Sequence, residues 1–317
     1  MNIQRLAAFA GITLHSAVLA LGAPVEDISK TAFVAPQAAE AQSAYNKAVE
    51  EAWRRYQTDV AKAAAAYAQA LKSAYKTEVE KDNLEEAMKL RDEIQRMSAD
   101  LQAGLVLYYS FDRPGPNGQI PDLSGKGNNG VLEGSRLVPT GKVAGACQFN
   151  IQNRKDRVIV RDSDTLDCKH VTIAAWIKSA DKDEFWNRIL DKDWKLGYNL
   201  CLGGAFQQQR FDGKVFFEMG EDAHIGSDAV VADGNWHHVA ATYDGQAMRM
   251  YIDGRIQKAV RKIVKDIAVN AFDIGIGNSR GGPDQNEFLG FDGLIDELRI
   301  YNRALSEKEV LLLFQGN

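Results

Sequence analysis

The sequence of 317 residues contains little cysteine, namely Cys147, Cys168 and Cys201. Three cysteines are too few to hold a fold of this length together, so a disulfide scaffold is excluded. Two alternatives stay open: one disulfide with a free thiol, or three reduced thiols. The sequence also lacks an excess of basic residues, because its net charge is -5. This charge argues against a nucleic-acid partner.

Sequence motifs of catalysis are missing as well. There is no nucleophile elbow, no HExxH, no P-loop and no zinc-type cluster. Asp292 and Asp296 come nearest to the paired carboxylates of a glycosidase. On one strand they would lie about 13 Å apart at 3.3 Å per residue. The carboxylates of an inverting glycosidase are under about 10 Å apart. We therefore expect no enzyme, and a glycoside hydrolase is the weakest alternative.

Apolar runs approaching membrane-spanning length are missing except at the N-terminus. There, Arg5 precedes the apolar run 6–21, and Ala20 and Gly22 are small residues suited to a cleavage site. The run predicts a signal peptide over residues 1–23, and the alternative is a retained anchor. No N-x-S/T acceptor occurs, which is more typical of a bacterial exported protein. We expect a secreted, periplasmic or cell-surface location.

Glycine and proline are missing from residues 37–103, which follow a proline-containing linker at 24–36. Alanine, glutamate and lysine dominate this segment, and Tyr, Val and Ala recur every three or four residues, as in a helical stripe. The residues at 81–83 interrupt the stripe before it resumes. The pattern predicts a helical hairpin, a coiled-coil-like arm over residues 37–103. The arm is either a spacer or a site of self-association or partner docking.

Short β-type runs separated by turns begin at Leu105 and predict an antiparallel sandwich. The central run, 236–254, predicts a hairpin whose alternating arms flank a turn centred on Asp244-Gly245. His237 and His238 would lie on opposite faces of the first arm, so they cannot bind one ion together. Near the C-terminus, Ser306 and Glu309 form a capping box that predicts a short helix.

Several strings occur in a family-like order: LVLYYSFD, DLSGKGNNG, VTIAAWIK, WHHVAATYDG with MYIDG, and FDGLIDELRIYNRALSEKEV. From Leu105 to about Phe314 the chain resembles laminin-G-like jelly-roll domains, which are related to concanavalin A. The resemblance implies a mainly β fold: an antiparallel jelly-roll β-sandwich (concanavalin A-like) at 105–317, preceded by the α-helical hairpin. Such domains include lectins, adhesion modules, spacers and a few enzymes, so the fold alone does not fix the function.

Acidic and amide residues suggest a metal site. Relatives of this shape often hold calcium near the junction of their first and last strands, and Asp112, Asp122, Asn128 and Asp296 match that placement loosely. Their oxygen atoms suit calcium. Alternatively, these side chains cap turns by accepting local hydrogen bonds. The resemblance therefore implies calcium in a structural role.

Large aromatic residues in a segment rich in charge suggest a binding site. Phe185, Trp186 and Trp194 lie in such a segment, whereas Trp176 and Trp236 fall in regular strands and are expected in the core. We expect Trp186 and Trp194 to contact ligand. The alternative is that they pack beneath their own loop.

The polar loop at 278–287 could form the rim of the same binding site. The prediction is an exported, non-catalytic protein that binds a glycan or an extracellular protein. The alternative is a structural component of the cell envelope or surface.

Overall fold

The computed structural model describes residues 69–115, 118–150, 152, 155–182, 186–206, 209–220, 222–279 and 290–315. For 92–99, 205–206 and 209 it describes the backbone alone. The predicted signal peptide, the linker, residues 37–68 of the arm, Phe185 and most of the 278–287 loop lie outside these ranges. Within them, no helix is both long and apolar enough to cross a membrane.

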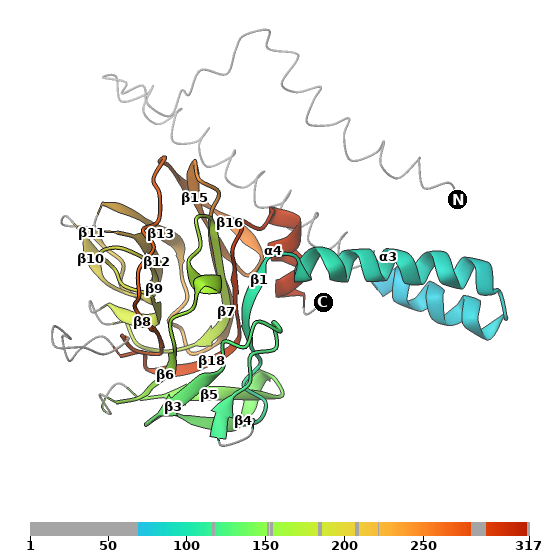
Figure 1. Cartoon of the computed structure of the whole chain (residues 1–317), viewed down its shortest axis with the longest axis horizontal. Coiled ribbons are helices and arrows are strands. Elements are labelled where there is room, and N and C mark those ends of the chain that lie inside the picture. Colours follow the sequence, from blue (N-terminus) through green and yellow to red (C-terminus); the bar gives the residue numbers. More distant parts are fainter. Residues whose placement is uncertain are drawn as a thin grey trace, which may run out of the picture. The chain divides into compact units, whose positions relative to one another are not determined.

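Two antiparallel eight-stranded sheets form a sandwich, which confirms the predicted fold class (Figure 1). Sheet A has the strand order β16-β15-β14-β7-β18-β5-β4, and β1 also pairs with β18. Its strands are β1 (Leu105–Tyr109), β4 (Arg136–Val143), β5 (Gly145–Phe149), β7 (Val171–Lys178), β14 (Trp236–Tyr243), β15 (Ala247–Ile252), β16 (Arg255–Lys262) and β18 (Gly293–Tyr301).

Sheet B has the order β13-β12-β9-β8-β17-β6-β3-β2. Its strands are β2 (Gln119–Ile120), β3 (Gly130–Glu133), β6 (Arg157–Val160), β8 (Asn187–Asp191), β9 (Tyr198–Leu202), β12 (Lys214–Met219), β13 (Ala223–Val230) and β17 (Ile274–Ile276). A small hairpin, β10 (Ala205–Phe206) with β11 (Gln209–Arg210), and the 3-10 turn η3 (Asp164–Leu166) complete the sandwich.

The core between the sheets follows from strict alternation along the strands. In β14, Val239, Ala241 and Tyr243 point into it, and in β15 Met248 and Met250 do so. The predicted hairpin and its two faces are therefore confirmed. The turn lies one residue later than predicted, because the Asp244 amide donates to the Ala247 carbonyl and leaves residues 245–246 at its centre.

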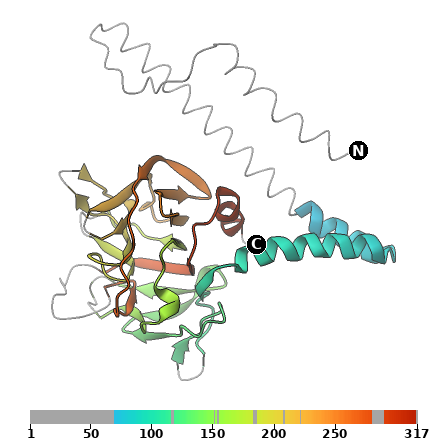
Figure 2. The ribbon, with the colours of Figure 1, turned by 45° about the horizontal axis from the view of Figure 1, so that its top comes forward.

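The outer face of sheet A is covered by the C-terminal helix α4 (Glu307–Phe314), seen from a second side in Figure 2. The predicted capping box is present. Trp176 stacks on Phe314 with ring centres 5.5 Å apart, and His238 meets the Trp176 ring at 5.4 Å. Burial lowers the pKa of His238 to about 3, so its imidazole is neutral. Trp176 is buried as predicted, but Trp236 is only half-buried.

Two helices precede the sandwich in the described part of the chain, residues 69–80 and α3 (Leu84–Gln102). The predicted break between them is present at 81–83, where Asp82 has a φ of 58°. Arg303 fastens the end of α3 to the sandwich: its Nε donates to the carbonyl of Ala103 and its Nη2 to that of Asp100, both at 2.6 Å. Leu101 packs in the same apolar cluster as α4.

The segment 181–194 was interpreted as rich in loop, but residues 187–191 form strand β8, and all five side chains are buried. The strand was missed because Asn187, Arg188 and Asp191 are polar yet buried, so the segment does not alternate. The three cysteines are free and buried, which decides the open alternative in favour of three thiols.

Candidate functional site

Two of the predicted calcium ligands hold the β4–β5 turn instead of facing open space. Asp112 accepts from the Gly145 amide at 3.0 Å. Asp296, which is buried, accepts from the Val143 amide at 2.9 Å and from the Glu297 amide at 2.7 Å. Burial raises the pKa of Asp296 to about 7. These two carboxylates therefore fasten the turn to β18 and to the end of β1.

The other two predicted ligands organise the loop after β1. One oxygen of Asp122 accepts from the Tyr108 and Ser124 amides at 3.0 and 2.9 Å, and the other accepts from the Asn128 amide at 2.9 Å. Asn128 donates to the Val106 carbonyl at 2.8 Å. Both side chains thus shape the loop in the way that turn-capping residues do.

These contacts can be compared with the needs of calcium, which takes six to eight oxygen ligands. The oxygens of Asp112, Asp122 and Asp296 receive N–H groups, whose positive ends point where a cation would sit. No group of three His, Cys, Asp or Glu side chains in the described ranges is arranged to hold a metal ion. The donor set as folded does not fit the ion, and calcium stays a prediction.

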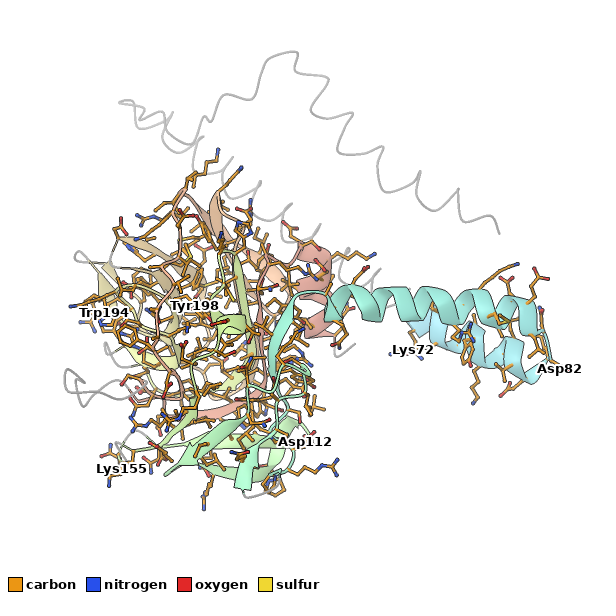
Figure 3. The ribbon with its side chains drawn as sticks, viewed as in Figure 1. Lys72, Asp82, Asp112, Lys155, Trp194 and Tyr198 are labelled. Carbon is orange, nitrogen blue, oxygen red and sulfur yellow. The ribbon has the colours of Figure 1, made fainter. Side chains whose placement is uncertain are left out.

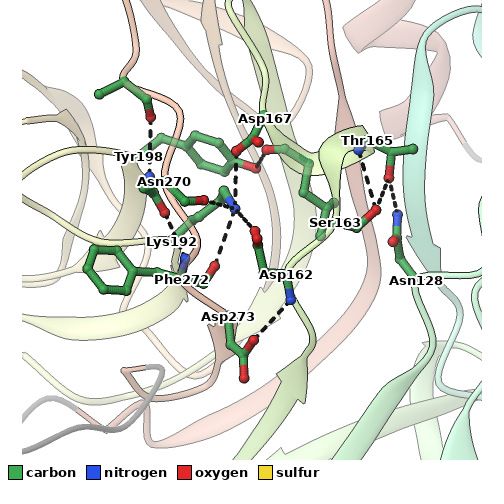
Figure 4. Close-up of polar contacts among 12 residues, drawn as sticks. Asn128, Asp162, Ser163, Thr165, Asp167, Lys192, Tyr198, Asn270, Phe272 and Asp273 are labelled. Carbon is green, nitrogen blue, oxygen red and sulfur yellow. Dashed lines mark hydrogen bonds and ion pairs between the residues drawn. The ribbon is translucent and has the colours of Figure 1, made fainter.

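A second polar centre lies beside η3 (Figure 4). The buried ammonium of Lys192 lies 2.7 Å from Asp162 and 3.5 Å from Asp167, and it also donates to the Phe272 carbonyl. The Tyr198 hydroxyl donates to the Leu166 carbonyl at 3.0 Å. These bonds tie η3 to sheet B, so we assign them a structural role.

The two predicted ligand-contacting tryptophans lie apart. Trp194, labelled in Figure 3 at the edge of the sandwich, is 40% exposed, and Leu196, two residues further along the chain, is also exposed. Trp186 is half-buried and meets Phe216 edge-on at 4.7 Å. They flank opposite ends of β8, a five-residue strand about 16 Å long at 3.3 Å per residue. They therefore cannot belong to one small-molecule site.

The outer face of sheet B beside Trp186 carries a polar group that the sequence interpretation missed. Strand register places Glu218 opposite Asn199, and Asn199 opposite Asp191. Cys201 lies opposite Arg188 in the same way. These five residues point away from the inter-sheet core, yet all are buried, and we call them the Arg188 cluster.

Directional hydrogen bonds link the Arg188 cluster. Arg188 Nη1 lies 2.9 Å from Asn199 Oδ1 and 2.8 Å from Cys201 Sγ. Asn199 Nδ2 donates to Glu218 Oε2 at 3.0 Å. Burial alone would lower the pKa of Arg188, but Cys201 and the carboxylates of Asp191 and Glu218 raise it, so the guanidinium stays charged. Its Nε is buried and has no hydrogen-bond partner among the described residues.

An aromatic group lies next to this cluster. Phe216, which belongs to no part of the inter-sheet core, contacts Trp186, stacks on His224 at 5.4 Å and meets Phe211 at 4.8 Å. The Arg188 guanidinium lies 5.9 Å from the centre of the Trp186 ring. Trp186 and His224 are half-buried, whereas Arg188 is 4% exposed, so the two rings are the parts that reach solvent. Aromatic surface with a few placed polar groups is typical of ligand sites.

Comparison of the sequence with protein-family models identifies the family of this chain. A model of the concanavalin A-like lectin/glucanases superfamily matches residues 152–311, about half of the chain. The chain belongs to this superfamily, which confirms the predicted laminin-G-like jelly roll. No curated protein matches the chain.

Similar solved structures share the fold at low sequence identity. The binding domain of Paraclostridial Mosquitocidal Protein 1 has 21% identity and a TM-score of 0.52, covering 68% of this chain and 52% of that one. Domain 4 of AbnA, a GH43 extracellular arabinanase from Geobacillus stearothermophilus, was solved with arabinotriose; it has 21% identity and a TM-score of 0.50, covering 67% and 98%.

Botulinum neurotoxin type C, whose cell entry depends on two ganglioside molecules, has 17% identity and a TM-score of 0.50, covering 68% and 52%. This chain therefore spans about half the length of the mosquitocidal and botulinum chains. At these identities the likeness shows the fold alone.

Proposed function

We propose that the protein is a non-catalytic glycan-recognition module that acts outside the cytoplasm and binds its ligand beside Trp186, on the outer face of sheet B. The observation that carries the proposal is the buried Nε of Arg188, which has no hydrogen-bond partner in the described part of the chain, next to an aromatic ring that reaches solvent. Sugars present apolar faces and many hydroxyls, and both find partners here. The arabinotriose bound by the similar arabinanase domain supports a glycan as ligand.

The carboxylates of the Arg188 cluster favour binding over hydrolysis. Asp191 and Glu218 lie two strands apart, about 10 Å between backbones at the usual strand spacing. Glu218 accepts from Asn199, and both carboxylates interact with the charged Arg188. Both carboxylates therefore help to keep Arg188 charged, a role that requires no catalysis.

The apolar surface of the two described helices supports a structural alternative. Tyr75, Val79, Leu84 and Met88 are exposed there, and Lys76, Lys81 and Lys89 are each paired with a glutamate of the same helices. A second copy of the chain could cover this neutral, apolar surface. In that role the sandwich would be held outside the cytoplasm as a surface component, and mass measurement by light scattering would give a dimer that Leu84→Lys reduces to a monomer.

The test of the glycan proposal compares three aromatic variants of the full chain on a glycan array. We expect Trp186→Ala to weaken binding at least thirtyfold, because truncating a central aromatic contact commonly costs 2 kcal/mol or more. Trp194→Ala and His237→Ala should bind within about twofold of the parent. A reducing-sugar assay with the same glycans should show no hydrolysis above background.

Trp186→Phe keeps an aromatic surface and separates lost stacking from lost folding. We expect this variant to fold and to retain part of the affinity. If Trp186→Ala binds normally while Trp194→Ala does not, the ligand lies at the other end of β8. If a glycan is hydrolysed in a Glu218-dependent manner, the module is an enzyme.

A further inference from the structure

The helix α4 leaves part of the outer face of sheet A uncovered. Trp176, on which Phe314 of α4 stacks, is 5% exposed. Lys178, the next outward-facing residue of β7, is exposed. Five neighbouring strands, β14, β7, β18, β5 and β4, cross this part of the face.

One row of side chains runs across these five strands on the outer face. Each member lies opposite the next in the strand register, and the members are, in order, Trp236, Lys178, Leu294, Gln148 and Arg136. Ile177 and Ile295, neighbours along β7 and β18, point into the core, so the row points away from it. None of its members is buried. The row is about 19 Å long at the usual strand spacing, and we call it the Lys178 row.

Three cations lie at the Lys178 row. Lys178 and Arg136 belong to it, and the ammonium of Lys142, from the end of β4, lies 4.1 Å from the centre of the Trp176 ring. Trp176 is the outward-facing residue next to Lys178 on β7. Arg136 donates from Nε to Gln148 at 2.9 Å. Within the described ranges, none of the three cations forms an ion pair with a carboxylate.

The carboxylates near these cations are less accessible than the cations. Asp296 lies opposite Trp176 but is buried. Asp156 interacts electrostatically with Arg136 and is also buried. Asp292, which precedes β18, is half-buried, whereas Lys142, Lys178 and Arg136 are all exposed. The Lys178 row therefore presents an excess of positive charge to solvent, on a chain whose net charge is -5.

The same row offers apolar surface between its cations. Trp236 and Leu294 are half-buried, and the Trp236 ring stacks on no other ring of the described residues. A sugar that carries an acidic group needs both features: a ring for its C–H face and a cation for its charge. Arg136 and Lys178 lie three strand spacings apart, about 14 Å between backbones. A saccharide chain with an anionic group on successive sugars spans this distance.

An acidic peptide or a nucleic acid fits the row less well. An extended peptide commonly binds a sheet by pairing its backbone with an edge strand. The backbones of β7 and β18 are already paired on both sides, so the centre of the row offers only side chains. The negative charge of the whole chain disfavours a nucleic acid.

We infer that the Lys178 row is a second binding site, for an anionic saccharide chain whose carboxylate or sulfate groups bind Lys178, Lys142 and Arg136 and whose rings lie against Trp236. It lies on the opposite outer face of the sandwich from Trp186. The inference goes beyond the proposed function, because neither site requires the other.

Titration calorimetry on the full chain tests this site with three probes of equal length: an oligogalacturonide, a heparin-derived sulfated oligosaccharide and a neutral cello-oligosaccharide. We expect one anionic probe to bind, to bind more weakly as salt screens the charges, and to identify carboxylate or sulfate as the preferred group. Lys178→Gln and Arg136→Gln should each weaken its binding about threefold, and the double variant about tenfold, as for exposed ion pairs. The neutral probe should show no dependence on either cation.

Lys169→Gln is the matched control, because it removes an exposed lysine beyond the other end of β7. This control and Trp186→Ala should leave the anionic probe bound as in the parent. An equal loss with Lys169→Gln would show unspecific attraction and overturn the inference, as would no anionic binding at all or tighter binding of an oligoglutamate peptide. Anionic binding that depends on Trp186 and not on Lys178 would also overturn it, and would leave the proposed function standing. Loss of every Trp186-dependent interaction would instead overturn only the proposed function.

Discussion

Asp296 makes the stability of the sandwich depend on pH in an unusual direction. Its carboxylate is fully buried between β18 and the β4–β5 turn, and burial raises its pKa to about 7. In the unfolded chain an aspartate titrates at about 3.9. The folded protein therefore holds this proton more tightly than the unfolded chain does. The contribution of Asp296 to stability is complete below about pH 4 and is lost as the pH rises to about 7.

The expected magnitude follows from the difference of about three pKa units. Each unit corresponds to 1.36 kcal/mol, so the free energy of unfolding contributed by this group should fall by about 4 kcal/mol between pH 4 and 7. The amides of Val143 and Glu297 that donate to the carboxylate stabilise the ionised form and are already included in the raised value. The slope should reach about 1.4 kcal/mol per pH unit near pH 5.5.

The assay is urea unfolding of the parent and of Asp296→Asn at half-unit steps from pH 4 to 8. Asparagine keeps the shape of the side chain and has no proton to titrate, and the difference between the two proteins cancels the other carboxyl groups. We expect the parent to lose its advantage over the variant as the pH rises. Curves that stay parallel across this range would show that Asp296 is ionised throughout and that the reasoning from burial is wrong.

Three further predictions concern the joint with the helices, the thiols and the metal. Arg303→Ala should lower the free energy of unfolding by about 1.5–3 kcal/mol, because a charged group loses its bonds to the last carbonyls of α3, and Arg303→Lys should restore part of it in urea melts. Cys147, Cys168 and Cys201 should resist a thiol reagent at pH 8 until the protein unfolds, since burial raises each pKa to about 12; fast labelling of the native protein would contradict this. Saturation with calcium at a hundredfold excess over Kd would stabilise by about 2.7 kcal/mol, so equal thermal melts with calcium and with chelator, which the amide contacts lead us to expect, would remove the calcium prediction.

Features that depend on local pattern could be predicted from the sequence. The hairpin at 236–254 alternates cleanly, so its two faces were assigned correctly along both arms. The Ser306 and Glu309 spacing predicted a real capping box. The turn between Tyr243 and Met248 was misplaced by one residue, because Asp244 closes the turn with its own amide instead of sitting at its centre.

The candidate site could not be predicted, because its residues follow the same alternating pattern as an ordinary strand with one face exposed to solvent. Asn199, Cys201 and Glu218 alternate with core residues, so polarity at these positions suggests exposure. In the structure Asn199 and Cys201 have no exposed surface, and Glu218 has 5%. Trp186 and Phe216 form an aromatic group on one face of the sheet. The face that they cover depends on contacts between strands that are distant in sequence. The sequence singled out Trp186, but its packing against Phe216 could not be predicted from it.

The two outer faces of the sandwich are buried by different chemistry, and the difference bears on function. The outer face of sheet A is covered by α4 through apolar side chains and stacked rings. Their burial stabilises the fold without removing a charged group from water. The face of sheet B instead buries a guanidinium and two carboxylates. Replacing such a buried ionic group by apolar residues of similar volume is often neutral or stabilising. Stability alone therefore does not account for the Arg188 cluster, and this supports our proposal that a ligand binds beside it.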